Sequence, residues 1–266
     1  MKYIQSKSKK KVMNVINMSQ YNISGNYVTI FGELHTTIPL LYDKKLGIGL
    51  DEFILDRIRK NKSIKILLEY NPDFNPLTIE SNNINEIYRK LYDNNLTSHI
   101  IPFDYKYYFI NYHDYFKLFN SLEFSKLTKN QIIKCYLDPY FDKSKHHAFN
   151  LDMIDYTKDA YNYLYEYLKN IENRLGYLYE DINLPKNKKV YKSNDTLRFE
   201  LIVNWANLAD FFILREILKK QTSEYIIVVG DNHRINMQKI LFNFPKLVET
   251  SGELFGIYEP EIKRKS

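Results

Sequence analysis

The sequence YIIVV at residues 225–229 constrains the fold of this 266-residue chain more than any other feature. Five apolar or aromatic residues in succession, ended by Gly230, are typical of a strand that is buried on both faces of a sheet. Residues 27–31 and 64–68 form two further runs of this kind, and stretches with helical apolar spacing separate the three runs. Strands that alternate with helices indicate a mainly parallel sheet, because parallel neighbours need long crossover connections.

The helices between these strands are predicted from apolar residues that recur every three or four positions. They are expected at residues 48–60, 84–92, 108–134, 152–180, 196–220 and 234–243. Residues 99–103 are expected to form a weaker strand, since Pro102 belongs at an edge or a strand end, and residues 254–258 a last strand. Residues 184–195 have the composition of an exposed loop. We therefore predict an α/β fold with a mainly parallel or mixed central sheet, helices on both faces and helical insertions.

The net charge of +6 is concentrated at the two ends of the chain. Residues 1–26 carry five lysines and no acid, the last six residues carry a net charge of +2, and the body between them is left with −1. We predict a basic tail or edge element at residues 1–25, one domain at residues 26–260 and a basic tail at residues 261–266. A body of this charge, without a nucleic-acid-binding module, argues against nucleic acid as the main partner beyond the tails.

Other features bear on the compartment. No stretch reaches the ~18 uninterrupted apolar residues of a membrane span, and the basic N-terminus lacks the apolar segment of a signal peptide. The single cysteine, Cys135, excludes an intramolecular disulfide and a cysteine-based zinc cluster. These features favour an intracellular, cytoplasmic protein. Only 8 glycines and 8 prolines beside 24 tyrosines are typical of an AT-rich gene, as in some large DNA viruses, protists and AT-rich bacteria. For a viral protein the compartment would be the host cytoplasm.

Ionisable side chains directly follow the expected strands. The sequence GELH at residues 32–35 follows the first strand, GDNH at residues 230–233 follows the last, and Glu69 follows the second. Ligands of open α/β sheets bind at the carboxyl ends of parallel strands, where polar side chains avoid the desolvation that they would suffer inside a strand. We therefore expect His35, His233 and two or three carboxylates to lie at one edge of the sheet.

Each of these residues also has a simple structural interpretation. A single histidine after a strand is more often a loop residue that caps the next helix, and an aspartate such as Asp104 is as often an ordinary helix cap. About 0.2 Gly-x-x-His matches are expected by chance in this composition, so two matches after buried strands favour a shared site. Other chemistries lack their motifs, because no G-x-S-x-G, P-loop or G-x-G-x-x-G sequence occurs and no motif surrounds Cys135.

Four features together resemble the TraB/PrgY and TIKI family, which belongs to a superfamily with ChaN-like haem-binding proteins and erythromycin esterases. They are the two Gly-x-x-His motifs, Glu69 at the end of the second strand, and an arginine in the helix before the second motif. Arg215 matches that arginine, with Arg198 as the alternative. The resemblance covers residues 27–70 and about 198–235.

The resemblance implies a site more firmly than a reaction. Members of these families include a metal-dependent protease, lactone-cleaving esterases and proteins without enzymatic activity. The chain is therefore expected to hydrolyse an amide or ester in a peptide or a small molecule, or to be a non-catalytic module that binds haem, metal or protein. TIKI proteins are membrane-anchored and extracellular, and this sequence shows neither feature.

Two mechanisms remain open. In the first, a divalent ion such as Mn, Co, Fe or Zn polarises the carbonyl and lowers the pKa of its bound water towards ~7. The expected ligands are His35, His233, Glu33 and Glu69. A glutamate that is not a ligand would then act as general base, and Arg215 would stabilise the oxyanion. In the second, a histidine takes the proton from water directly and a glutamate sets its tautomer. Asp104 and Asp231 are expected beside the substrate or behind these groups.

Overall fold

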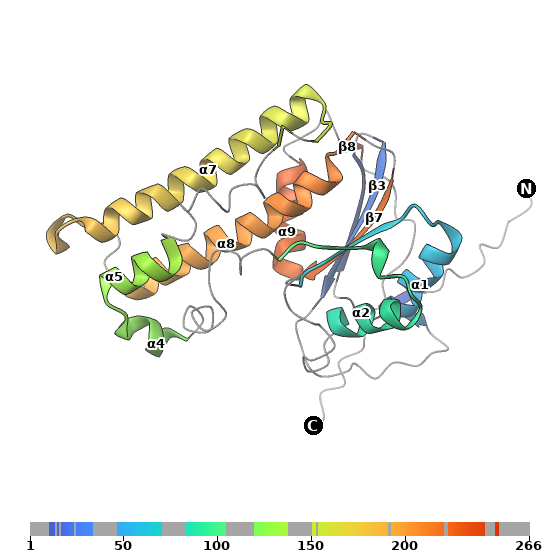
Figure 1. Cartoon of the computed structure of the whole chain (residues 1–266), viewed down its shortest axis with the longest axis horizontal. Helices are drawn as coiled ribbons and strands as arrows, with labels where there is room; N and C mark the ends of the chain where they lie inside the picture. Colours follow the sequence, from blue (N-terminus) through green and yellow to red (C-terminus); the bar gives the residue numbers. More distant parts are fainter. Residues whose placement is uncertain are drawn as a thin grey trace, which may run out of the picture. The chain divides into compact units, whose positions relative to one another are not determined.

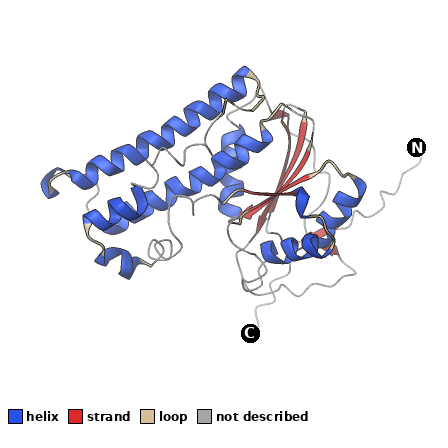
Figure 2. Cartoon of the chain, viewed as in Figure 1, coloured by secondary structure: helices blue, strands red, loops and turns tan. Residues whose placement is uncertain are grey.

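The computed structural model of the chain describes residues 11–13, 15, 17–23, 25–33, 47–70, 83–104, 120–137, 151–152, 154–190, 193–220, 223–242 and 248–249. The chain divides into two compact units. The first unit combines residues 1–102 with residues 221–266, and the second is residues 103–220. Figure 2 shows that the described strands belong to the first unit and that the second unit is helical. The prediction of one domain at residues 26–260 stays a prediction.

Six of the described strands form a mixed sheet in the order β6-β5-β7-β3-β2-β8. They are β2 (Asn17–Ile23), β3 (Asn26–Glu33), β5 (Lys65–Leu68), β6 (Ile100–Pro102), β7 (Glu224–Gly230) and β8 (Val248–Glu249). The first four strands of this order are parallel, whereas β2 runs antiparallel to β3 and β8 runs antiparallel to β2 (Figure 1). A separate parallel pair joins β1 (Lys11–Met13) to β4 (Gly47–Gly49). The predicted α/β fold with a mainly parallel, mixed sheet is confirmed.

The three predicted runs are the central strands β3, β5 and β7. The weaker run at residues 99–103 contains β6 at the edge of the sheet, and Pro102 is the last residue of that strand. The strand predicted at residues 254–258 lies outside the described residues. Strand β2 occupies residues 17–23, within the segment expected to be a tail or an edge element.

Helices cover both faces of the sheet, as predicted (Figure 1). One face packs against α1 (Leu50–Lys60) and α2 (Asn83–Asp93), and this core includes Phe31, Phe53, Ile66, Ile87 and Val228. The opposite face packs against α9 (Asp231–Phe242), whose Met237 and Leu241 are buried. Helix α9 begins three residues before the predicted start at residue 234, so the motif at residues 230–233 enters the first turn of a helix.

The second unit contains α4 (Ser121–Lys126), α5 (Lys129–Ile132), a π-turn at Ile133–Leu137, α7 (Lys158–Asn183) and α8 (Asn194–Ile217). The helical structure predicted at residues 108–134 is present in most of the described part, but as separate helices, because Leu127 is extended and Thr128 starts α5 with a capping box. Helix α8 is capped by Ser193, whose Oγ accepts a hydrogen bond of 3.2 Å from the Thr196 N–H. Of the loop predicted at residues 184–195, residues 184–188 are exposed, whereas Asn194 and Asp195 belong to α8.

Candidate functional site

Three strands end side by side at the carboxyl edge of the sheet. In the pairing of β3 with β7, Glu33 lies opposite Gly230, and on the other side of β7 Leu68 of β5 lies opposite Val228. Glu69 follows β5 directly and reaches the end of β7, where its Oε2 accepts a hydrogen bond of 3.1 Å from the Gly230 N–H. Two residues with carboxylate side chains therefore flank the last residue of β7.

His233 lies in the first turn of α9, directly after β7. Its Nε2 is 3.7 Å from Oε1 of Glu69, and the two side chains are 14% and 9% exposed. This distance suits an ion pair when the imidazole is protonated, although it is longer than a hydrogen bond. The two oxygens of Glu69 are thus divided between the amide of Gly230 and the imidazole of His233. The positive end of the α9 dipole further stabilises the carboxylate.

The glycine of the first motif has a packing role. A Cβ at Gly32 would overlap Oδ1 of Asp231 and lie 3.0 Å from Nε of Arg234, because α9 packs closely on β3 at this point. Arg234 donates from Nε to Asp231 Oδ1 at 2.5 Å and from Nη1 to Ser19 Oγ of β2 at 3.1 Å. Asp231, expected beside the substrate or behind the site, therefore contacts Arg234 and fixes the helical turn that carries His233.

Glu33 is the second carboxylate at this edge. It is the last residue of β3 and only 2% exposed. Because side chains alternate along a strand, it shares a face with Phe31 and points away from the α9 side, where Gly32 lies. The rest of the first motif, including His35, lies outside the described residues.

The other predicted site residues belong to the second unit. Asp104, two residues after β6, is 5% exposed. Arg215 lies near the end of α8, and its backbone carbonyl accepts a hydrogen bond of 2.9 Å from the Tyr156 hydroxyl. Arg198 lies in the second turn of α8 and is partly exposed. The participation of Asp104 and of either arginine in the site stays a prediction.

The donors for a metal ion are incomplete in the described part of the chain. No group of three or more His, Cys, Asp or Glu side chains is arranged there to hold a metal. Glu69 and His233 supply two facing donors, and a catalytic zinc-type centre uses three protein ligands. The predicted ligand His35 lies outside the described residues, so the divalent ion stays a prediction and no reaction step is derived through it.

Sequence reasoning missed Arg234 and Ser19. Arg234 is 6% exposed and joins the first turn of α9 to β2. The sequence contains a signal for it, since Asp231 and Arg234 are three residues apart, a spacing typical of an ion pair on one helical turn. The sequence gives no such signal for Ser19, because β2 mixes polar and apolar residues and a serine within it does not indicate a particular partner.

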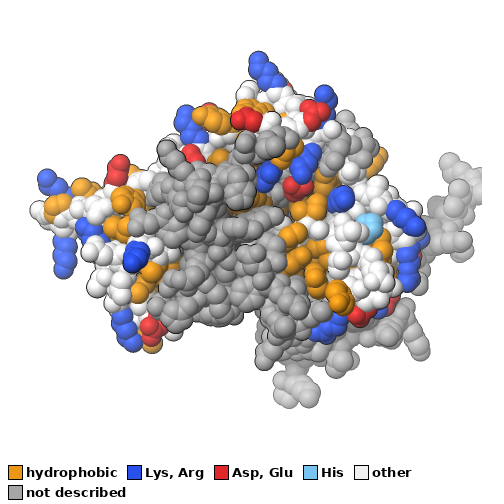
Figure 3. All heavy atoms as spheres, viewed as in Figure 1, with side chains coloured by type: hydrophobic (Ala, Val, Ile, Leu, Met, Phe, Trp, Pro, Cys, Tyr) orange, Lys and Arg blue, Asp and Glu red, His pale blue; other side chains and the backbone are white. Residues whose placement is uncertain are grey.

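The surface of the described residues bears on the expected partners. On the face shown in Figure 3, the described lysine and arginine side chains are scattered among acidic and apolar ones, without a continuous basic stripe. Within the described ranges, no helix combines the length and the apolar character that crossing a bilayer requires. The prediction that nucleic acid is not the main partner remains a prediction, consistent with this distribution.

Comparison of the chain with protein-family models finds no match, and neither the curated proteins nor the solved structures contain a significant one. The resemblance to the TraB/PrgY and TIKI family therefore depends on the motif residues alone.

Proposed function

We propose that the carboxyl edge of β3, β5 and β7 is a hydrolytic site in which His233 acts as general base and Glu69 orients it. The observation that carries the proposal is the approach of the Glu69 carboxylate to the His233 imidazole, at 3.7 Å, across the ends of two strands. The bond cleaved is an amide or ester in a peptide or a small molecule, as the resemblance to the TraB/PrgY–TIKI family and the erythromycin esterases implies.

The surroundings of Glu69 support its role as the orienting group. Its Oε2 is held by the Gly230 N–H, which leaves Oε1 facing Nε2 of His233. A carboxylate beside an imidazole favours the tautomer with the proton on the facing nitrogen, so we assign the proton to Nε2 and leave Nδ1 as the acceptor. Contacts of this kind are often long in the free enzyme and shorten when substrate binds.

The reaction balances with water as the only co-reactant. Nδ1 of His233 takes a proton from water as the water oxygen bonds to the carbonyl carbon, and Glu69 stabilises the imidazolium that forms. The C–N or C–O bond then breaks, and His233 returns the proton to the leaving amine or alkoxide. General base catalysis of this type contributes about 10²–10⁴-fold to a rate.

The remaining predicted residues have subsidiary roles in the proposal. Glu33, buried beside Gly230, is the second acid of the site in this proposal, whereas the roles expected of His35 and of an arginine of α8 stay predictions. If a divalent ion is bound, the expected ligands His35, His233, Glu33 and Glu69 would hold it. The ion would then supply a hydroxide at neutral pH.

A non-catalytic module that binds haem, metal or protein is the second candidate. The observation that favours it is that both oxygens of Glu69 face groups of the fold itself, the Gly230 amide and the His233 imidazole. A carboxylate in this position also stabilises the N-terminus of a helix without any catalytic role.

Turnover of a panel of ester and peptide substrates, measured with and without a chelator, tests the proposal. His233→Ala should lower turnover by about 10²-fold or more. His99→Ala is the matched control, since it removes a partly buried imidazole whose Nδ1 lies 2.9 Å from the Ile64 carbonyl, at the amino end of β5. Its turnover per folded molecule should equal that of the wild type. Absence of turnover of every substrate, or a loss in His233→Ala that only follows its loss of folded protein, would favour the binding module.

A further inference from the structure

A polar pocket lies between the two long helices of the second unit, α7 and α8, which run side by side (Figure 1). Its volume is about 330 Å³, within the range of small-molecule sites. Helix α7 contributes Asn170, Asn173, Arg174 and Tyr177, and α8 contributes Glu200 and Asn204. The residues of each helix recur at intervals of three and four, so each set lies on one helical face.

Asn204 is the buried polar residue of this pocket. It is 1% exposed, and its Nδ2 donates to the backbone carbonyl of Glu200 at 2.8 Å. This bond fixes the orientation of the amide, because a flipped side chain would bring two oxygens together. Oδ1 of Asn204 is buried and accepts no hydrogen bond within the structure described. A buried acceptor in this state is unfavourable, so a bound molecule that donates a hydrogen bond to it gains affinity.

Charges of both signs line the same pocket. Arg174 is an exposed residue of α7, and Glu200 is a partly exposed residue of α8. None of the ion pairs recorded between described residues joins these two side chains, although they share one pocket. Opposite charges that line a pocket without direct contact can each bind one end of a small molecule with two charges.

We propose that this pocket binds a small zwitterion of the free amino-acid type. Its ammonium group donates to Oδ1 of Asn204 and to the carboxylate of Glu200, while its carboxylate accepts hydrogen bonds from the guanidinium of Arg174. Asn170 and Tyr177 supply further polar and aromatic surface for the side chain of the ligand. The observations favour a zwitterion over a phosphate-bearing ligand because Glu200 would repel a second negative group, and over a polyol because a polyol matches neither charge.

Calorimetric titration of the full chain with each of the twenty free L-amino acids tests this proposal, and it does not involve the hydrolytic site. We expect saturable one-to-one binding of at least one amino acid at millimolar concentration or below. N-acetylation of that ligand should weaken binding at least tenfold, because it removes the ammonium group. Arg174→Gln and Asn204→Leu should each weaken it at least tenfold, provided that circular dichroism shows them folded.

The control variant is Lys169→Gln, which removes a positive charge from an exposed position of α7 that does not line the pocket. Its affinity should equal that of the wild type. Absence of binding by all twenty amino acids overturns the proposal. Equal binding of the acetylated ligand overturns it as well, and so does a binder whose affinity is unchanged in both Arg174→Gln and Asn204→Leu.

Discussion

Glu69 and His233 face each other across the carboxyl ends of β5 and β7, with 3.7 Å between Oε1 and Nε2. The parallel pairing of β5 with β7 brings these two distant parts of the chain together, and the Gly230 N–H holds the carboxylate in place. The two contacts of Glu69 therefore require different properties of its side chain, one for the structure and one for the proposed function. The Gly230 contact needs only an acceptor, whereas the contact with the imidazole needs a negative charge.

Glu69→Gln separates these two requirements. Glutamine keeps an oxygen that accepts from Gly230 but loses the charge that faces His233. We expect turnover to fall by about 10²-fold, as for loss of an effective general base, while stability falls by about 1 kcal/mol or less. Steady-state kinetics and urea denaturation measure the two effects. A loss of activity that only parallels the loss of folded protein would contradict the assigned role.

Gly32→Ala tests the close packing of α9 on β3. A methyl group at Gly32 would overlap Asp231 Oδ1 and crowd Arg234, so we expect a loss of about 1–3 kcal/mol in the free energy of unfolding. Gly176→Ala is the matched control, since nothing lies within 4 Å of a Cβ at this position of α7. It should stabilise the protein by about 0.5–1 kcal/mol, because alanine favours a helix over glycine. Chemical denaturation that ranks the two variants in the opposite order would contradict this packing.

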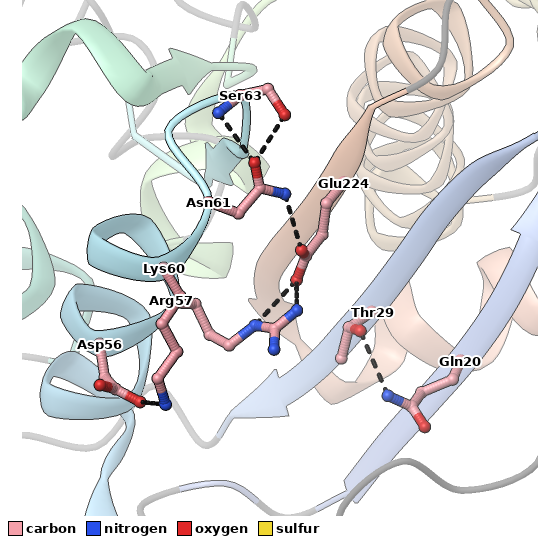
Figure 4. A network of polar contacts seen from close by, with 8 residues as sticks. All are labelled: Gln20, Thr29, Asp56, Arg57, Lys60, Asn61, Ser63 and Glu224. Atoms are coloured by element: carbon pink, nitrogen blue, oxygen red, sulfur yellow. Dashed lines mark hydrogen bonds and ion pairs between the residues drawn. The ribbon is translucent and has the colours of Figure 1, made fainter.

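A partly buried polar contact at the amino end of β7 should contribute more than an exposed one nearby (Figure 4). Arg57 of α1 donates from Nε and Nη2 to Oε1 of Glu224, at 3.0 and 2.5 Å, and the Glu224 side chain is 14% exposed. Glu224→Gln should lower the free energy of unfolding by about 1–3 kcal/mol. Asp56→Asn removes the ion pair with Lys60, in which the Lys60 side chain is 66% exposed and the Asp56 side chain 51%. This substitution should change the free energy of unfolding by about 0.5 kcal/mol or less. Equal effects of the two substitutions would show that burial does not decide the contribution.

Two tyrosines of α7 should make the second unit sensitive to alkali. Burial raises the pKa of Tyr163 to about 12, and burial together with the charge of Asp210 raises the pKa of Tyr167 further. A phenol with a higher pKa in the folded state stabilises the fold fully below its unfolded value near 10, and this contribution is lost as the pH rises through the folded pKa. The urea concentration at the midpoint of unfolding should therefore decrease as the pH is raised from about 10 to about 12.

Tyr163→Phe should remove part of that fall, because phenylalanine has no group to ionise. Tyr165→Phe is its control, as the Tyr165 side chain is 51% exposed on the same helix. Urea midpoints measured from pH 8 to about 12 compare the two variants with the wild type. An alkaline slope that is the same in Tyr163→Phe and the wild type would contradict a role for this partly buried phenol.

The central strands and the long helices could be predicted from the sequence because burial on both faces leaves an uninterrupted apolar run, and a buried helical face leaves a clear period. Strand β2 could not, since its sequence NMSQYNI mixes polar and apolar residues and gains its structure from pairing with β3. The break at Leu127 was also missed, because a four-residue helix capped by Thr128 keeps the apolar spacing of one longer helix.

The candidate site could be predicted in part for the same reason. Polar residues directly after buried strands identified Glu69 and His233, and the structure brings them together. The sequence could not show that Gly32 serves packing against α9, or that Asp231 is engaged by Arg234, since both depend on how a helix lies on a sheet. The predicted start of α9 at residue 234 is three residues later than the start in the structure, at Asp231.

Rescue of His233→Ala by added imidazole distinguishes a catalytic His233 from a structural one. The His233 side chain is 14% exposed, so its removal leaves a space beside Glu69 that solvent can reach. Imidazole should restore part of the hydrolysis in His233→Ala, in a saturable way, and should restore none in the double variant with Glu69→Gln. Hydrolysis that stays absent at every imidazole concentration, in a variant whose melting temperature matches the wild type, would contradict the assignment of His233 as the general base.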